Sequence, residues 1–498
     1  MTTTTTKIHF LVLLAAVFLA PPGALCATDK AADQPNIVLI YADDIGYGDL
    51  SCYGATKVKT PNCDKLAVSG IRFTDGHSVA SVCTPSRYSL MTGEYAFRKK
   101  GTGIASGLQG LLIDPDRTTL PSVLQKAGYR TGVVGKWHLG LGTTPTNYNQ
   151  AIKPGPREVG FDYAWILPAT GDRVPCVWVK NDRVVNLDPK DPITLDYTVA
   201  RGDKGSFVHG VPRIGGQTGG KAALWKDDEM SFVIAEKSCD FIEEGKNKDK
   251  PFFLFMATHN IHVPRVPNAK FKGKSHCGVR GDAIVEFDWM VGQVLDKLDK
   301  LGLAENTLVV LTSDNGGVND DNGPDKVSGI GDPDATNGHK PNGVLRGTKG
   351  TVFEGGTRVP FVVSWPAKVK PGTSAALMSQ MDLLASFAAL TGQPLLKGQA
   401  PDSENHLDAL LGTKNAGREF LVEQSNGGAP FGFRHGTWKL VPAGPKAKEV
   451  GPALFDLATD LSETKNVAAA NPEKVTAMAA KLAEVTGQPA PKKVKNPQ

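Results

Sequence analysis

The stretch Ser81-Val-Cys-Thr-Pro-Ser-Arg-Tyr-Ser-Leu-Met-Thr-Gly93 places Cys83 just before a run of residues that is typical of a helix. Pro85 fits the first turn of a helix, because the backbone N–H that proline lacks has no intrahelical partner there. The free N–H groups and the positive end of the helix dipole would point at any anion that meets Cys83. Arg87, one turn further on, adds a guanidinium to the same place. The stretch therefore predicts a cysteine at a helix start that is suited to an anion.

Upstream, the apolar run Asn36-Ile-Val-Leu-Ile-Tyr-Ala42 leads into two adjacent carboxylates, Asp43 and Asp44. The run does not alternate between polar and apolar residues, which is typical of a parallel strand buried on both faces. Two neighbouring carboxylates repel each other unless a cation lies between them, so a hard divalent ion is the economical explanation. A solvated acidic turn is the alternative.

Downstream, three more segments place polar side chains in or after short strands, which we expect within 130–140, 251–257 and 306–312. The polar residues are Lys136, His138, His259, His262, Asp314 and Asn315. Lys136 and His138 occupy alternate positions, so we expect them on one side of an extended chain. His262 either reaches a substrate or is only part of a loop. Asp314 and Asn315 can complete an all-oxygen cation site, although turn chemistry alone also explains Asp-Asn-Gly-Gly.

Helical spacing of apolar residues in 230–244 and 283–301 alternates with these strands. The alternation predicts an α/β fold with a large mixed, mostly parallel sheet flanked by helices. In such sheets ligands bind beyond the carboxyl ends of the strands, which is where the polar residues fall. The sequence therefore predicts one active site built from distant segments.

The motif Cys83-Thr-Pro-Ser-Arg87 resembles the signature of the type I sulfatases, in which the cysteine is oxidised to Cα-formylglycine after synthesis. Five further segments match that family in order and span most of residues 36 to 360, among them Gly-Lys-Trp-His at 135–138 and the Gly-x-Lys-Gly context of Lys349. The resemblance implies an alkaline phosphatase-like fold and sulfate ester hydrolysis. It also implies a formylglycine-generating maturase as a partner.

The resemblance implies a role for each matching residue. The catalytic residues that it implies are Cys83, Arg87, Lys136, His138, His259 and Lys349. Its metal ligands are Asp43, Asp44, Asp314, Asn315 and the diol derived from Cys83, an oxygen-rich set that suits Ca²⁺ or Mg²⁺ and favours Ca²⁺ through its carboxamide. In this mechanism a diol oxygen attacks sulfur, His138 deprotonates the second hydroxyl to expel sulfate, and His259, assisted by Lys349, protonates the departing sugar oxygen.

The substrate is expected to be a sulfated carbohydrate, because the Thr-Gly-Asp-Arg stretch at 170–173 is similar to polysaccharide sulfatases, including the N-acetylgalactosamine 6-sulfatase type. Asp172 and Arg173 are candidates for sugar contacts, with a surface ion pair as the alternative. His209 is a weaker candidate in the glycine-rich segment 201–227, for which a long loop is expected. Small aryl sulfates are expected to serve as artificial substrates.

Two other functions stay open from the sequence. One is a phosphate or phosphonate ester hydrolase of the same superfamily, and the other is a non-catalytic sulfated-glycan-binding protein with an unoxidised Cys83. The formal net charge of +5 is compatible with an anionic substrate but falls short of a nucleic-acid-binding surface.

The sequence also suggests a signal peptide, domain boundaries and one possible disulfide bridge. Residues 1–27 are expected to be a signal peptide, whose apolar run is too short to span a membrane, so the enzyme would be periplasmic or extracellular. Cys26 leaves a lipoprotein as the alternative. The expected units are a catalytic domain at 28–412, a smaller α+β C-terminal subdomain with an antiparallel sheet at 413–486, and a basic tail at 487–498. A bridge between Cys52 and Cys63 is left open.

Overall fold

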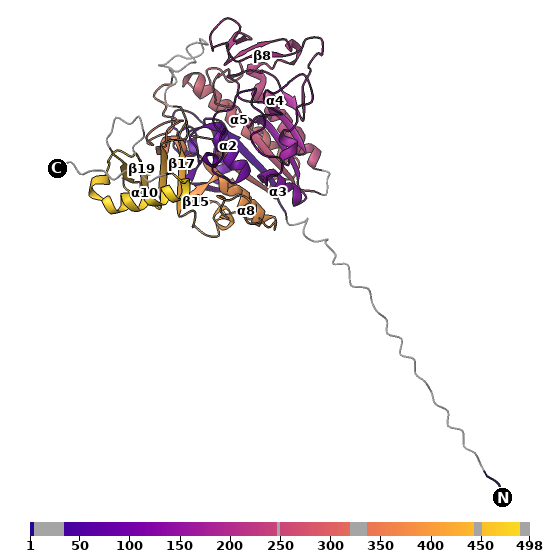
Figure 1. Cartoon of the computed structure of the whole chain (residues 1–498), viewed down its shortest axis with the longest axis vertical. Coiled ribbons are helices and arrows are strands. Elements are labelled where there is room, and N and C mark those ends of the chain that lie inside the picture. Colours follow the sequence, from indigo (N-terminus) through magenta and orange to yellow (C-terminus); the bar gives the residue numbers. More distant parts are fainter. Residues whose placement is uncertain (4–33, 247–249, 319–335, 443–450, 489–498) are drawn as a thin grey trace.

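The structure is a computed structural model that describes residues 1–3, 34–246, 250–318, 336–442 and 451–488. Its main feature is one large sheet (Figure 1). The strands of this sheet are β1 (Asn36–Ala42), β2 (Ile71–Phe73), β4 (Arg130–Lys136), β5 (Tyr163–Leu167), β6 (Val179–Lys180), β7 (Arg183–Val184), β12 (Phe252–Ala257), β13 (Thr307–Ser313), β14 (Phe361–Ser364) and β15 (Gly372–Ser374).

The ten strands lie in the order β15-β2-β14-β13-β1-β12-β4-β5-β6-β7. The five strands from β13 to β5 run parallel, and β14 and β6 pair antiparallel with the two sides of this group. The expected α/β class with a mixed, mostly parallel sheet is confirmed.

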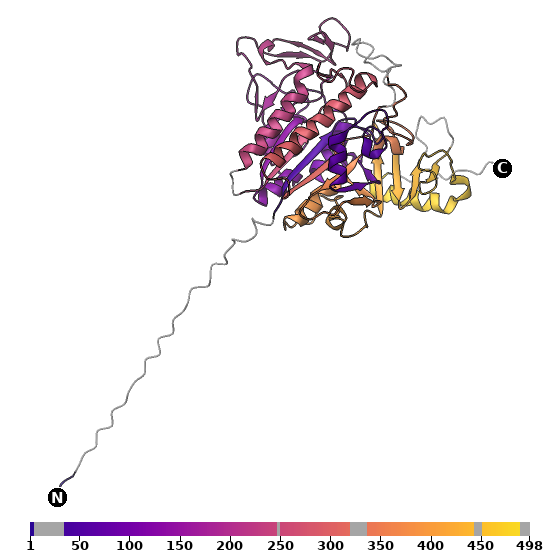
Figure 2. The same ribbon diagram turned by 180° about the vertical axis from the view of Figure 1, so that it is seen from behind.

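Helices cover both faces of this sheet, as the two opposite views show (Figures 1 and 2). One face packs against α2 (Cys83–Thr92), α3 (Leu120–Lys126) and α8 (Leu383–Leu390), and the other against α1 (Pro61–Val68), α4 (Met230–Gly245) and α5 (Gly278–Lys300). Strand β1 contributes Ile37 and Leu39 to the first core and Val38 and Ile40 to the second. Its apolar run lacks alternation because both of its faces are buried.

Several short helices also occur among the described residues. They are α7 (Glu354–Thr357), α9 (Leu407–Leu410) and the 3-10 helices η1 (Ser51–Tyr53), η2 (Ala96–Arg98), η3 (Pro156–Val159), η4 (Lys221–Ala223), η5 (Asp227–Glu229), η6 (Gln380–Asp382) and η7 (Ala468–Ala470).

The segment between residues 194 and 218 is more ordered than the expected long loop. It contains β8 (Thr194–Asp196), β9 (Phe207–Val208), β10 (Val211–Pro212) and β11 (Gly216–Thr218), where β9 pairs with β10 and β8 with β11. Each strand has only two or three residues, so the glycine-rich composition gives no periodic signal of them.

A second, antiparallel sheet lies near the C-terminus, as expected. It consists of β17 (Phe420–Gln424), β18 (Phe431–His435), β19 (Trp438–Val441) and β20 (Ala453–Asp456), packed against α10 (Pro472–Thr486). The small pair β3 (Gly76–His77) and β16 (Met378–Ser379) lies apart from both sheets. The Ser81 N–H donates to Gln424 O at 2.9 Å, so β17 supports the segment just before Cys83.

Some expectations concern the ends of the chain and the cysteines. Residues 4–33 and 489–498, which hold most of the expected signal peptide and basic tail, lie outside the described residues. All six cysteines within the described ranges are free, so the bridge between Cys52 and Cys63 is not formed. Among the described helices, none is both long and apolar enough to cross a membrane.

Candidate active site

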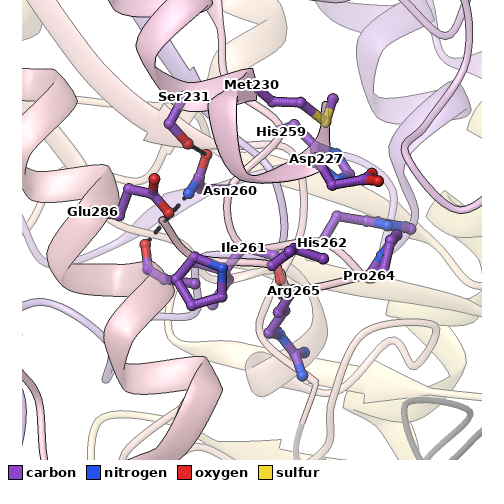
Figure 3. Close-up of a pocket in the computed structure, with 13 residues that line it drawn as sticks. Asp227, Met230, Ser231, His259, Asn260, Ile261, His262, Pro264, Arg265 and Glu286 are labelled. Atoms are coloured by element: carbon purple, nitrogen blue, oxygen red, sulfur yellow. Dashed lines mark hydrogen bonds between the residues drawn. The ribbon is translucent and has the colours of Figure 1, made fainter. Parts of the chain in front are cut away.

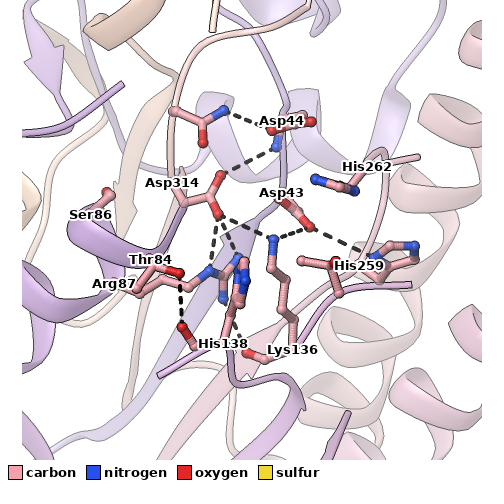
Figure 4. Close-up of polar contacts among 12 residues, drawn as sticks. Asp43, Asp44, Thr84, Ser86, Arg87, Lys136, His138, His259, His262 and Asp314 are labelled. Carbon is pink, nitrogen blue, oxygen red and sulfur yellow. Dashed lines mark hydrogen bonds and ion pairs between the residues drawn. The ribbon is translucent and has the colours of Figure 1, made fainter. Parts of the chain in front are cut away.

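The candidate site lies at the carboxyl ends of four neighbouring parallel strands (Figure 4). Asp43 and Asp44 follow β1, Lys136 ends β4, His259 follows β12, and Asp314 follows β13. Parallel strands bring their carboxyl ends to one edge, so residues that are more than 200 positions apart in sequence become neighbours.

Three buried carboxylates form the centre of the site. Asp43, Asp44 and Asp314 are at most 2% exposed, and each offers a carboxylate oxygen within 4.8 Å of the others. Lys136 Nζ lies 2.7 Å from Asp43 Oδ2, and Lys349 Nζ lies 2.6 Å from Asp44 Oδ1. The cluster is therefore paired with cations on two sides.

Arg87 completes the ring of positive charge. Its Nε and Nη2 donate to Asp314 Oδ2 at 3.0 and 2.8 Å, and Nη1 donates to the Lys136 carbonyl at 3.1 Å. The guanidinium also lies over the ring of Tyr41, at 5.1 Å from its centroid. A fully buried guanidinium with these partners has one fixed orientation.

Electrostatics split the carboxylates into two kinds. Burial opposes ionisation of Asp43, but Lys136 holds the pKa of Asp43 well below its usual range. Burial and repulsion by Asp43 raise the pKa of Asp314 to about 6. Lys136 therefore stabilises the ionised form of Asp43, whereas Arg87 and Lys136 do not fully offset burial and repulsion at Asp314.

A divalent cation fits this cluster. Asp43 Oδ1 and Asn315 Oδ1 are buried without a hydrogen-bond partner, and Asn315 Nδ2 donates to Asp44 Oδ1 at 2.8 Å. Two orphaned oxygens beside three carboxylates form the hard, all-oxygen donor set that calcium and magnesium prefer.

Cys83 begins α2 and is 2% exposed. The next residue, Thr84, donates from Oγ1 to the His138 carbonyl at 3.1 Å. On the other side, the Gly350 N–H donates to Ser81 O at 2.8 Å, which ties the segment that follows Lys349 to the residues before α2. The helix start thus lies between the segments that carry His138 and Lys349.

His138 reaches the site by a different route from the one expected. Strand β4 ends at Lys136, and His138 adopts a left-handed conformation with φ of 55°, so strand alternation does not describe its direction. Its Nε2 contacts Ala105 O at 3.0 Å, while Nδ1 has no partner. Burial, with Lys136 and Arg173 nearby, lowers the pKa of His138 well below its usual value, which leaves a neutral ring with a free nitrogen.

His259 and His262 line a pocket beside the carboxylates, together with Asp227, Met230 and Arg265 (Figure 3). His259 Nδ1 lies 3.8 Å from Asp43 Oδ2, and neither ring nitrogen of His259 has a hydrogen-bond partner. The ring of His262 lies 5.8 Å from that of His259. Burial, with Lys349 nearby, lowers the pKa of His262 to about 4.

Asp172 and Arg173 form the ion pair that was the alternative to sugar contacts, but the pair is largely buried and does not lie on the surface. Arg173 Nε donates to Asp172 Oδ1 at 3.1 Å, and their side chains are 13% and 7% exposed. Arg173 Nη1 donates to Ala105 O at 3.1 Å, the same carbonyl that His138 contacts. Burial opposes ionisation of Asp172, but Arg173 lowers the pKa of this carboxyl.

The structure brings together the candidate residues except His209. His209 is exposed in the turn between β9 and β10, and no contact to the carboxylate cluster exists within the described chain. Sequence reasoning missed Ala105 and Gly171. Ala105 contacts His138 and Arg173 through its carbonyl, and Gly171 leaves room for the ring of His259 because it has no side chain. Neither leaves a chemical signature in a sequence.

Comparison with known proteins agrees with this arrangement. Residues 35–393 match the family model described as Sulfatase. The chain belongs to the sulfatase family. It is 46% identical over 485 residues to an N-acetylgalactosamine-6-O-sulfatase of Bacteroides thetaiotaomicron, which covers 91% of this chain and 93% of the relative. Human arylsulfatase A is 32% identical over 486 residues, or 91% of this chain and 88% of the relative.

A solved structure shares the fold of this sulfatase. It comes from work on glycosaminoglycan metabolism by Bacteroides thetaiotaomicron and superimposes with a TM-score of 0.86 at 45% identity, covering 91% of this chain and all of the other. The chain is therefore an enzyme that hydrolyses sulfate esters.

Proposed function

We propose that this sulfatase removes the 6-sulfate of an N-acetylgalactosamine unit in a sulfated glycan. The observation that carries the proposal is the 46% identity to an N-acetylgalactosamine-6-O-sulfatase along 91% of the chain. The buried pair of Asp172 and Arg173 supports it, because a carboxylate and a guanidinium can hydrogen-bond sugar hydroxyls beside the reacting ester.

The proposal includes two groups that the family uses. Asp43, Asp44, Asp314 and Asn315, with the group at residue 83, would hold a divalent cation, for which the carboxamide favours calcium over magnesium. The cation would stabilise negative charge on the sulfate, and formylglycine made from Cys83 by a maturase would supply the nucleophilic oxygen.

The protein's own cations would stabilise the transition state. Arg87, Lys136 and Lys349 converge on the carboxylate cluster, so their charges are fixed before substrate binds. Charge that is already oriented costs no reorganisation during the reaction. Removing one of these groups should lower kcat by about 10² to 10³, as the loss of one oxyanion donor does.

The two histidines would move protons on opposite sides of the sulfur. His138 Nδ1 has no partner and would accept the proton released at residue 83 when sulfate leaves. His259 lies on the pocket side, at 3.8 Å from Asp43, and would protonate the sugar oxygen with help from Lys349. Within the pocket, His262 would contact the sugar.

The decisive experiment compares sulfated sugars on protein co-expressed with a maturase. Released sulfate is measured by ion chromatography from N-acetylgalactosamine 6-sulfate, its 4-sulfate isomer and N-acetylglucosamine 6-sulfate, with Cys83→Ala as the inactive control. Preferential release from the first sugar supports the proposal. Turnover of an aryl sulfate without release from any sugar would contradict it, and a higher kcat/KM on an aryl phosphate would favour the phosphate hydrolase.

We also propose that the enzyme is exported after removal of residues 1–27, because a basic residue, an apolar run and Pro21-Pro22 follow one another there. N-terminal sequencing of the mature protein tests this. A protein that retains its first residues in the cytoplasm would contradict it.

A further inference from the structure

A fully buried arginine, Arg213, lies behind the loop that carries Asp172 and Arg173. Its side chain is 0% exposed, and Nη2 donates to both oxygens of Asp227 at 2.7 and 2.6 Å. Its Nη1 donates to the carbonyl of Gly171. Trp225 Nε1 donates to Asp227 Oδ1 at 3.2 Å and so holds the Asp227 carboxylate in place. The guanidinium therefore joins η5 to the residue just before Asp172.

The neighbouring backbone fixes the same loop. The Ile214 N–H donates to Asp172 O at 2.7 Å, and the Val174 N–H donates to Ile214 O at 3.2 Å. Arg173 and Ile214 thus form an isolated parallel β-bridge, so a shift of one segment moves the other.

Gly171 links this loop to the catalytic histidine His259. A β-carbon on Gly171 would lie 2.4 Å from His259 Nε2, so the loop backbone packs directly against the histidine ring. Asp172 follows immediately in the chain, and Arg173 shares the Ala105 carbonyl with His138. The place of the Gly171 carbonyl therefore sets how Asp172 and Arg173 face the substrate.

The pair has no contact with the cations that face the sulfate. Among described residues, the Arg213 side chain hydrogen-bonds to Gly171 and Asp227, whereas Arg87, Lys136 and Lys349 bind the carboxylate cluster. A buried ion pair often adds little net stability, and its rigid fork is better suited to fixing geometry. Losing it should change substrate binding more than sulfate chemistry.

We propose that Arg213, held by Asp227, is a positioning residue that aligns Asp172 and Arg173 for the glycan part of the substrate. The inference rests on the proposed function, since it assigns the loop to glycan recognition. A small aryl sulfate has no sugar for the loop to contact, so the two substrate types should respond differently.

The test uses the double variant Arg213→Met and Asp227→Asn, which removes the pair without leaving a buried charge unpaired. We expect KM for the sulfated N-acetylgalactosamine to rise about tenfold or more, because a displacement of about 1 Å is costly in an oriented site. The KM for an aryl sulfate, which has no sugar for the loop to contact, should rise at least threefold less than the KM for the sugar. Arg213→Lys, which keeps one donor, should recover part of the KM.

Controls separate this role from a structural one and from failure of the proposed function. The pair Arg98 and Asp402, whose side chains are 34% and 9% exposed, should leave the KM ratio unchanged when it is changed to Met and Asn. Unchanged glycan KM in the double variant, or equal losses on both substrates with a lower Tm, would overturn the inference. If the double variant does not fold, Arg213→Lys alone must raise the glycan KM. A wild-type enzyme inactive on every sugar overturns the proposed function and the inference together.

Discussion

Arg87 and Asp314 form a fully buried ion pair in which two guanidinium nitrogens, Nε and Nη2, donate to one carboxylate oxygen at 3.0 and 2.8 Å. Arg87 also donates to the Lys136 carbonyl, so one side chain orients both a proposed metal ligand and the segment that bears a second cation.

We therefore expect Arg87→Lys to be strongly impaired although the charge is kept. Lysine cannot make the two parallel donations of a guanidinium, so Asp314 and the sulfate would both lose a fixed partner. Steady-state kinetics on an aryl sulfate should show kcat lower by about 10² to 10³, the cost of losing one fixed charge donor. A kcat within threefold of wild type would refute this role.

Gly171→Ala should impair catalysis through His259. The added methyl group would lie 2.4 Å from His259 Nε2, so the ring must move. Kinetics should show a loss of about 10² in kcat, as for a small misplacement of a catalytic group. Gly103→Ala is the matched control, since its β-carbon would meet open space. Equal kinetics in the two variants would show that His259 tolerates the shift.

Removal of divalent cations should reduce both activity and stability. Asp43, Asp44 and Asp314 are buried together, and a ligand that binds only the native state stabilises it. Treatment with EGTA should lower Tm and abolish sulfate release, and calcium should restore both better than magnesium. Chelated protein with unchanged Tm and full activity would count against a cation site.

Glu286 should make stability depend on pH. Burial raises its pKa from 4.5 to about 7, so the native state binds more protons than the unfolded state between these values. The stabilising contribution is present below pH 4.5 and is lost as pH rises through about 7, by an amount of order 3 kcal/mol.

Urea denaturation at pH 5 and pH 8 measures this effect. The free energy of unfolding of wild type should fall between these values more steeply than that of Glu286→Gln, which has no proton to lose. Parallel pH profiles for the two proteins would show that Glu286 does not titrate in this window.

Much of the fold could be predicted because strands that are buried on both faces appear in the sequence as uninterrupted apolar runs. The apolar runs at 36–42 and 251–257 became β1 and β12, and the polar residues after them met at one edge of the sheet. The conformation of His138 could not be predicted, since its left-handed backbone depends on contacts with Ala105 and Thr84.

Arg213 was missed for a similar reason. It lies in a glycine-rich segment without periodicity, and its partner Gly171 is 42 positions away and acts through its carbonyl. Residues that position others by backbone contacts carry no motif, so tertiary structure is needed to find them.

The central claim, that Cys83 is converted to the nucleophile of a sulfatase, is tested most directly by mass spectrometry of the tryptic peptide Phe73–Arg87, taken from protein co-expressed with a maturase. The account predicts a peptide lighter by the change from CH2SH to CHO, which establishes formylglycine at residue 83. An intact thiol at full occupancy in an active enzyme would contradict the account.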